Sequence, residues 1–125
     1  MYQSDGTTGI PDAVVEYYSG GWLDFGTTGS DGCVEKEILA KNYKFRVTYA
    51  NASVEKYHDL SVDPTVVFET VNAIVELRDS TGSLIDPGEA AYYSGGWHSI
   101  GTTSGGQISM ELLPKNYKFR MTYDV

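Results

Sequence analysis

The most informative stretch of the sequence is KNYKFRVTY at residues 41–49, which returns as KNYKFRMTY at residues 115–123. Within each copy, large apolar side chains alternate with Lys, Arg and Thr. Alternation of this kind is typical of a β-strand that buries one face. We therefore expect strands over 43–49 and 117–123.

The same duplication extends outward from this stretch. YYSGGW occurs at 17–22 and at 92–97, an offset of 75 residues, and GTT follows at 26–28 and 101–103. A fixed offset over several motifs indicates an internal repeat. The chain thus contains two copies, neither of them complete, of a unit that repeats every 75 residues or so.

Neither unit is whole. The segment 50–71 has no counterpart after Tyr123, and NAIVELRDSTGS at 72–83 has no counterpart before YYSGGW in the first copy. We expect a first β-sandwich repeat at 1–71 that lacks a convincing opening strand. The second repeat, at 72–125, lacks its closing pair.

Further strands are indicated by alternation or by β-branched residues between Gly-rich turns. No segment sustains the 3.6-residue period of an amphipathic helix. The fold class is therefore all-β, two tandem sandwich repeats that are each incomplete at one end. These strands are expected at 53–60, 65–71, 73–78 and 107–113.

Composition excludes several classes of function. The chain has 125 residues with 9 basic and 17 acidic side chains, and a net charge of -8 disfavours binding to nucleic acid. No apolar run approaches the roughly 20 residues of a membrane-spanning helix.

A single cysteine, Cys33, excludes an internal disulfide and is expected to be an exposed, incidental thiol. No spaced motif for metal, cofactor or catalysis is recognisable, so we expect no enzyme activity.

The YYSGGW motifs carry the candidate ligand-binding residues. Neighbouring residues of a strand point to opposite faces, so Tyr18 and Tyr93 can lie outside, near Trp22 and Trp97 respectively. Exposed aromatic rings suit stacking against a sugar, which makes a glycan one candidate partner. The alternative is that each Trp covers the open end of its sandwich.

Basic side chains form an outward row on the repeated strand. Lys44 and Arg46 alternate with the apolar residues, and acidic partners are available at Glu16, Glu35 and Glu37. Cross-strand ion pairs of this kind predict a solvated, charge-balanced sheet face rather than a binding patch.

The second unit resembles the prealbumin-like repeats grouped as carboxypeptidase-regulatory-like and Cna-B-type Ig-like domains. Their pattern is a first strand ending in Asp-x-x-Gly, a Thr-x-x-x-Gly turn, and a closing Leu-x-x-Gly-x-Tyr before the last apolar strand. The corresponding residues are Asp79, Gly82, Thr103, Gly106, Leu113 and Tyr117, with Thr28, Gly32, Leu39 and Tyr43 in the first unit. The sequence departs from the pattern in two ways: Asn116 and Asn42 stand where a Gly is usual before the Tyr, and the intervals 103–106, 113–117 and 39–43 are each one residue shorter.

The resemblance implies a non-enzymatic stalk or spacer repeat of an extracellular microbial surface protein. Two alternatives remain open. A unit that lacks a strand exposes backbone groups that neighbouring repeats or identical chains can pair with, which would build a filament head to tail. The second alternative is a carbohydrate-binding module that uses the exposed Tyr and Trp side chains.

Overall fold

The computed structural model describes residues 1–123, which contain nine β-strands and no helix. The predicted all-β class is confirmed. The strands are β1 (Val14–Tyr18), β2 (Trp22–Thr27), β3 (Asn42–Tyr49), β4 (Ala52–Asp59), β5 (Val71–Glu76), β6 (Gly88–Tyr93), β7 (Trp97–Thr102), β8 (Gln107–Leu112) and β9 (Lys118–Tyr123).

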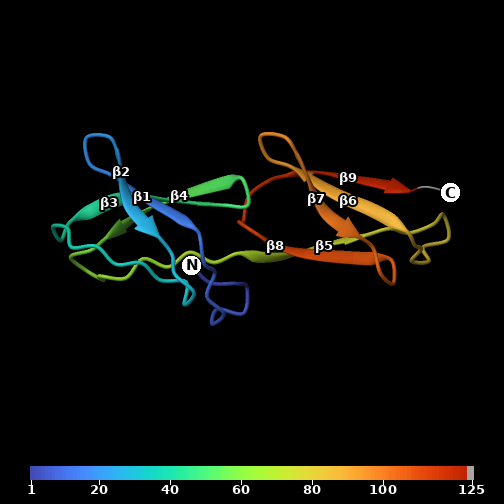
Figure 1. The fold of residues 1–125 in the computed structure, drawn as a ribbon, viewed down its shortest axis with the longest axis horizontal. Coiled ribbons are helices and arrows are strands. Elements are labelled where there is room, and N and C mark those ends of the chain that lie inside the picture. Colours follow the sequence, from blue (N-terminus) through green and yellow to red (C-terminus); the bar gives the residue numbers. More distant parts are fainter. Residues whose placement is uncertain (124–125) are drawn as a thin grey trace.

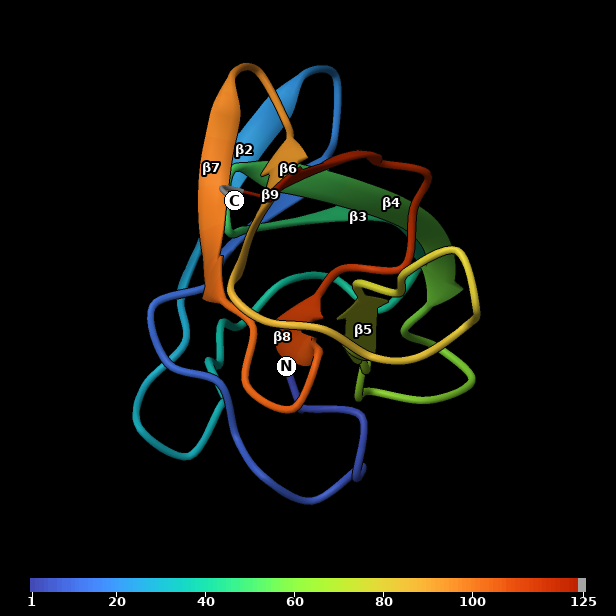
Figure 2. The same ribbon diagram turned by 90° about the vertical axis from the view of Figure 1, so that its right-hand side faces the viewer.

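The strands form three antiparallel sheets, in the orders β2-β1-β3-β4, β5-β8 and β7-β6-β9. The first sheet and the two others lie at opposite ends of an elongated molecule (Figure 1). We call residues 1–70 the first lobe and residues 71–123 the second lobe. Seen along the long axis, the β5-β8 layer lies beneath β6, β7 and β9 (Figure 2). The second lobe is therefore a small β-sandwich.

The repeated sequences fold into the same hairpin in both lobes. Tyr18 pairs with Trp22 at the end of β1-β2, and Tyr93 pairs with Trp97 at the end of β6-β7. In the first turn, Gly20 has a φ of 70°, a conformation that residues with a Cβ adopt only at a cost. The Gly-Gly pair of the motif thus makes the tight reversal that brings the aromatic side chains together.

The alternating pattern of β3 sets the core of the first lobe. Phe45 and Val47 are 1% and 0% exposed. Their counterparts in the second lobe behave differently, since Phe119 is 44% exposed. The difference arises because the segment 50–70 folds back over the first lobe, and the described part of the second lobe has no equivalent segment.

Most strand predictions agree with the structure to within two residues, but the strand predicted at 65–71 is wrong. Only Val71 lies in a strand, as the first residue of β5. The preceding residues make a single isolated bridge, between Glu69 and Tyr2. High β-propensity does not produce a strand here, because no neighbouring strand offers a ladder of partners.

Candidate functional site

The predicted aromatic pair of the first lobe lies on the outer face of the four-stranded sheet. The ring centroids of Tyr18 and Trp22 are 5.5 Å apart and nearly perpendicular. The guanidinium of Arg46 stacks 4.1 Å from the Trp22 ring centroid, and its Nη2 lies 2.9 Å from the Glu16 carboxylate. Trp22 is therefore a partner in a cation–π contact on the face of the sheet that carries Arg46 and Glu16.

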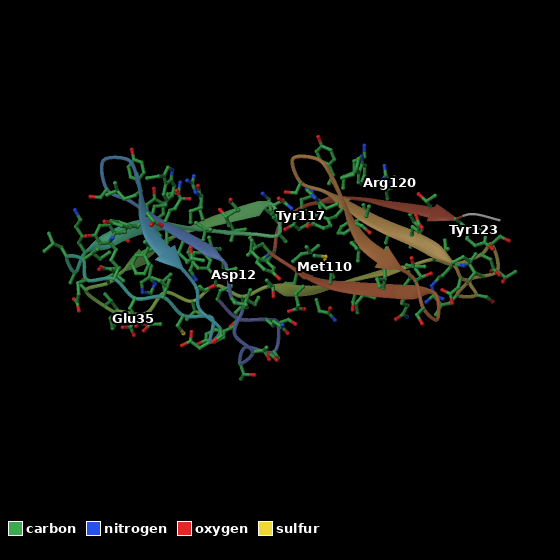
Figure 3. The ribbon with its side chains drawn as sticks, viewed as in Figure 1. Asp12, Glu35, Met110, Tyr117, Arg120 and Tyr123 are labelled. Atoms are coloured by element: carbon green, nitrogen blue, oxygen red, sulfur yellow. The ribbon has the colours of Figure 1, made fainter. Side chains whose placement is uncertain are left out.

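The second lobe repeats this cluster. Tyr93 and Trp97 are 5.4 Å apart, and the Arg120 guanidinium lies 4.3 Å from the Trp97 ring centroid. Arg120 projects on the outer side of the sheet (Figure 3). The structure thus brings together Tyr18 with Trp22 and Tyr93 with Trp97, and it places the two pairs in different lobes. Sequence reasoning missed both arginines as ring partners, although alternation had placed them on this face.

A shallow pocket of about 370 Å³ adjoins the first cluster. Tyr57 of β4 forms one side of it and is 71% exposed, and the Lys44 ammonium lies 5.6 Å from its ring centroid. The described part of the second lobe has no counterpart of β4, so this pocket belongs to the first lobe. Its lining residues are Tyr18, Trp22, Asn42, Tyr43, Lys44, Glu55 and Tyr57.

The predicted ion pairs on the outer face are correct in part. Arg46 pairs with Glu16 as expected. Glu35 and Glu37 were the wrong partners, because their segment forms no strand beside the sheet. Glu55 of β4 takes that place, 3.1 Å from the Lys44 ammonium. The face is charge-balanced within the sheet itself.

A larger groove of about 730 Å³ opens on the inner side of the first lobe. Its walls are the segments 33–37 and 64–68, and its floor includes Phe25, Phe45 and Val47. In Figure 1 both wall segments cross beneath the sheet as ribbon without arrows. Sequence reasoning anticipated both a first unit without a convincing opening strand and an apolar groove exposed in such a unit.

Charged groups lie at the rim of this groove. The Lys56 ammonium donates a hydrogen bond to the backbone carbonyl of Val67 and lies 4.6 Å from the Phe68 ring centroid. Burial lowers the pKa of Lys56. Burial likewise lowers the pKa of the Met1 ammonium, which donates to the Gly32 carbonyl at 2.6 Å. Cys33 is exposed, as predicted, with its Sγ 3.7 Å from the Tyr2 hydroxyl.

Titratable side chains are dispersed over the molecule. Within residues 1–123 no three His, Cys, Asp or Glu side chains gather in a manner that could hold a metal ion. Each His ring instead contacts a nearby backbone carbonyl, His58 that of Asp63 at 2.9 Å and His98 that of Ser94 at 3.0 Å. No helix in the described part of the chain is long and apolar enough to cross a membrane.

Comparisons with known proteins add no relative: no protein-family model, curated protein or solved structure matches this chain.

Proposed function

We propose that this chain is a non-enzymatic structural repeat module, a stalk or spacer in an extracellular microbial surface protein. The observation that carries the proposal is the joint between the lobes. Leu113 belongs to the second lobe, is 0% exposed, and lies in one hydrophobic cluster with Phe45 and Phe68 of the first lobe. A side chain shared in this way couples the two lobes through packing.

Hydrogen bonds reinforce the joint. The Tyr92 hydroxyl donates to the Ala50 carbonyl at 2.9 Å, and the Lys115 ammonium donates to the Ser53 carbonyl at 3.2 Å. Tyr117 lies at the same boundary (Figure 3). These contacts join the β3-β4 turn of one lobe to the near end of the other.

Hydrogen bonds also fix the point at which the chain passes from the first lobe to the second. Thr70 is the last residue before β5, and its hydroxyl donates to the Glu111 carboxylate at 2.9 Å, as the Ser4 backbone N–H does at 2.6 Å. Partial burial opposes ionisation of Glu111, yet the hydrogen bonds from Ser4 and Thr70 keep its pKa below the ordinary value. The chain thus passes between lobes without a flexible linker.

A spacer needs length and a stiff joint, and it needs no reaction centre. The elongated arrangement, the packed joint and the near-identical repeated segments support this role. Assignment to prealbumin-like tandem repeats, and a location outside the cell, rest on the sequence resemblance. In intact source cells, we expect added protease or antibody to reach the chain.

Stiffness can be tested directly with spin labels at equivalent positions in the two lobes. Cys33 is native, and Gln107→Cys places a second thiol at its counterpart. Double electron–electron resonance should give a single narrow distance distribution, because both lobes are fixed by the joint. A broad distribution would contradict a spacer role.

The pocket beside Tyr18 supports a second candidate, glycan binding. It combines exposed aromatic rings with the polar side chains of Asn42 and Glu55, a composition that suits a neutral sugar. The native chain and the Tyr93→Ala variant should be retained on a polysaccharide column, and the Tyr57→Ala variant should not. Elution of the native chain and both variants in the void volume would exclude glycan binding.

A further inference from the structure

The outer faces of the two lobes differ in charge, although their aromatic and basic residues repeat. In the first lobe, Arg46 donates from Nε and Nη2 to one oxygen of the Glu16 carboxylate, at 3.0 and 2.9 Å, while its guanidinium stacks on Trp22. Glu16 lies opposite Arg46 in the sheet. In the second lobe, Ala91 lies opposite Arg120 in the same way. The second lobe therefore has the arginine but lacks the carboxylate that binds it.

A second acidic side chain of this face is also missing from the second lobe. In the first lobe, Asp24 of β2 lies opposite Glu16. In the second lobe, Ser99 of β7 lies opposite Ala91. The acidic residue of β6, Glu89, lies two residues beyond Ala91, at the end of the strand away from the Gly-Gly turn. The two missing carboxylates belong to positions on β6 and β7, so a further strand beside β9 would leave these positions uncharged.

The basic residues of the second face form no ion pair within the described part of the chain. The ion pairs among residues 1–123 all involve other basic side chains, so neither Lys118 nor Arg120 takes part in one. Both residues are exposed, whereas the paired Arg46 side chain is 26% exposed. The stack on Trp97 holds Arg120 in place. Its N–H groups can therefore bind an anion from solution.

The aromatic residues beside Arg120 are accessible. Tyr93 is 48% exposed and Trp97 is 37% exposed. Lys118 lies opposite Tyr93 in the sheet, so a second cationic side chain belongs to the same part of the face. The turn that follows Tyr93 contains Gly95 and Gly96, where an added Cβ would meet nothing within 4 Å. The cluster thus combines two cations with an aromatic surface that is open to a ligand.

We propose that this cluster is a binding site for an acidic sugar, that is, a sugar unit with a carboxylate. We call it the acidic-sugar site, and it consists of Tyr93, Trp97, Lys118 and Arg120. The first lobe shows the chemistry, because the Glu16 carboxylate there binds a guanidinium that is stacked on the equivalent tryptophan. In the second lobe the carboxylate of the ligand would accept from Arg120, and the sugar ring would pack against Tyr93.

The charge of the chain restricts the ligand further. A net charge of -8 repels densely charged anionic polymers. A glycan with an isolated carboxylate on an otherwise uncharged body meets the two cations and little repulsion. The acidic-sugar site and the pocket beside Tyr57 lie in different lobes. The proposal depends neither on that pocket nor on the spacer function.

The tryptophan side chains allow a test on the full chain. The sequence has 2 tryptophans, Trp22 and Trp97, so their indole N–H signals in an NMR spectrum report on one lobe each. The variant Trp22→Phe assigns the two signals. The probe is methyl β-D-glucuronide, and methyl β-D-glucoside is the same ring without a carboxylate. We expect the glucuronide to shift the Trp97 signal with a Kd of about 1 mM, and the glucoside to bind at least about tenfold more weakly.

Three variants test the role of the missing carboxylate. Ala91→Glu supplies the side chain that the first lobe has, so it should fill the site and weaken glucuronide binding at least about tenfold. Arg120→Gln should weaken binding by a similar factor. Arg46→Gln is the matched control and should bind as the native chain does, because Arg46 already binds Glu16. Native affinity in Ala91→Glu or Arg120→Gln, or an equal loss in Arg46→Gln, would overturn the proposal.

Two measurements separate a sugar from other sources of a carboxylate. N-acetylglycine has a carboxylate on a peptide-like body, and binding as tight as that of the glucuronide would refute the assignment to a sugar. Light scattering should give a mass that stays at 13.7 kDa at the concentrations used for NMR. A mass that rises with concentration in the native chain but not in Ala91→Glu would show that a second copy supplies the carboxylate, and would also refute the assignment.

Discussion

Replacing Leu113 by alanine should destabilise the molecule more than any other single change at the joint. The side chain is 0% exposed and packs among core residues of the first lobe, including Phe45 and Phe68. Removing three buried carbon atoms costs about 2.4 kcal/mol in transfer free energy, at about 0.8 kcal/mol per carbon. With the cavity that remains, the expected loss is about 3 kcal/mol, inside the range of about 2–5 kcal/mol measured for buried leucines.

The repeat supplies the control. Leu39 is the counterpart of Leu113 and is 77% exposed, at the far end of the first lobe. Leu39→Ala should change the free energy of unfolding by less than about 0.5 kcal/mol. Urea unfolding, followed by tryptophan fluorescence and circular dichroism, measures both variants. Equal losses, or a loss below about 1 kcal/mol for Leu113→Ala, would refute the packed joint on which the spacer function rests.

Two further predictions concern single positions. The pKa of Asp5 is lowered to about 2 by hydrogen bonds from the Thr8 hydroxyl and nearby backbone N–H groups. Its contribution to stability is therefore present above about pH 4 and is lost as the pH falls towards 2, and an NMR titration midpoint near 4 would contradict this. Gly88→Ala should destabilise the second lobe by about 1 kcal/mol, because a Cβ there would come within 2.7 Å of the side-chain ends of Leu77 and Met121, which must shift. Thermal unfolding measures this loss, and an unchanged midpoint would count against the close packing of Gly88 on these two side chains.

The sequence predicted those features that depend on local alternation. The pattern of Tyr43, Phe45 and Val47 gave both a strand and its buried face, because a strand alternates its side chains with period two. The exposed positions of Tyr18 and Tyr93 followed from the same rule. Their proximity to Trp22 and Trp97 followed from the short Gly-Gly turn.

Features that depend on neighbouring strands in the fold were harder to predict from the sequence. The segment 65–71 has strand-forming residues, but only a neighbouring strand can convert propensity into a ladder. The stacking of Arg46 on Trp22 required the register between β1, β2 and β3, which alternation alone does not fix. The sequence also did not predict that Leu113 is buried whereas its counterpart Leu39 is exposed. The stretches around them are nearly identical, and only the fold shows that they have different neighbours.

The central claim is that the two copies of the repeat are built differently, with β8 paired in the second lobe and residues 33–38 unpaired in the first. Amide hydrogen exchange tests this claim most directly, because it compares the two segments within a single molecule. The hydrogen-bonded amides of β8 pair with β5, whereas Cys33–Ile38 has no paired strand. We predict that the amides of residues 34–38 exchange at least about a hundredfold faster than the paired amides of β8. Equal protection of the two segments would show that the first lobe already has a strand in its groove and would contradict the account.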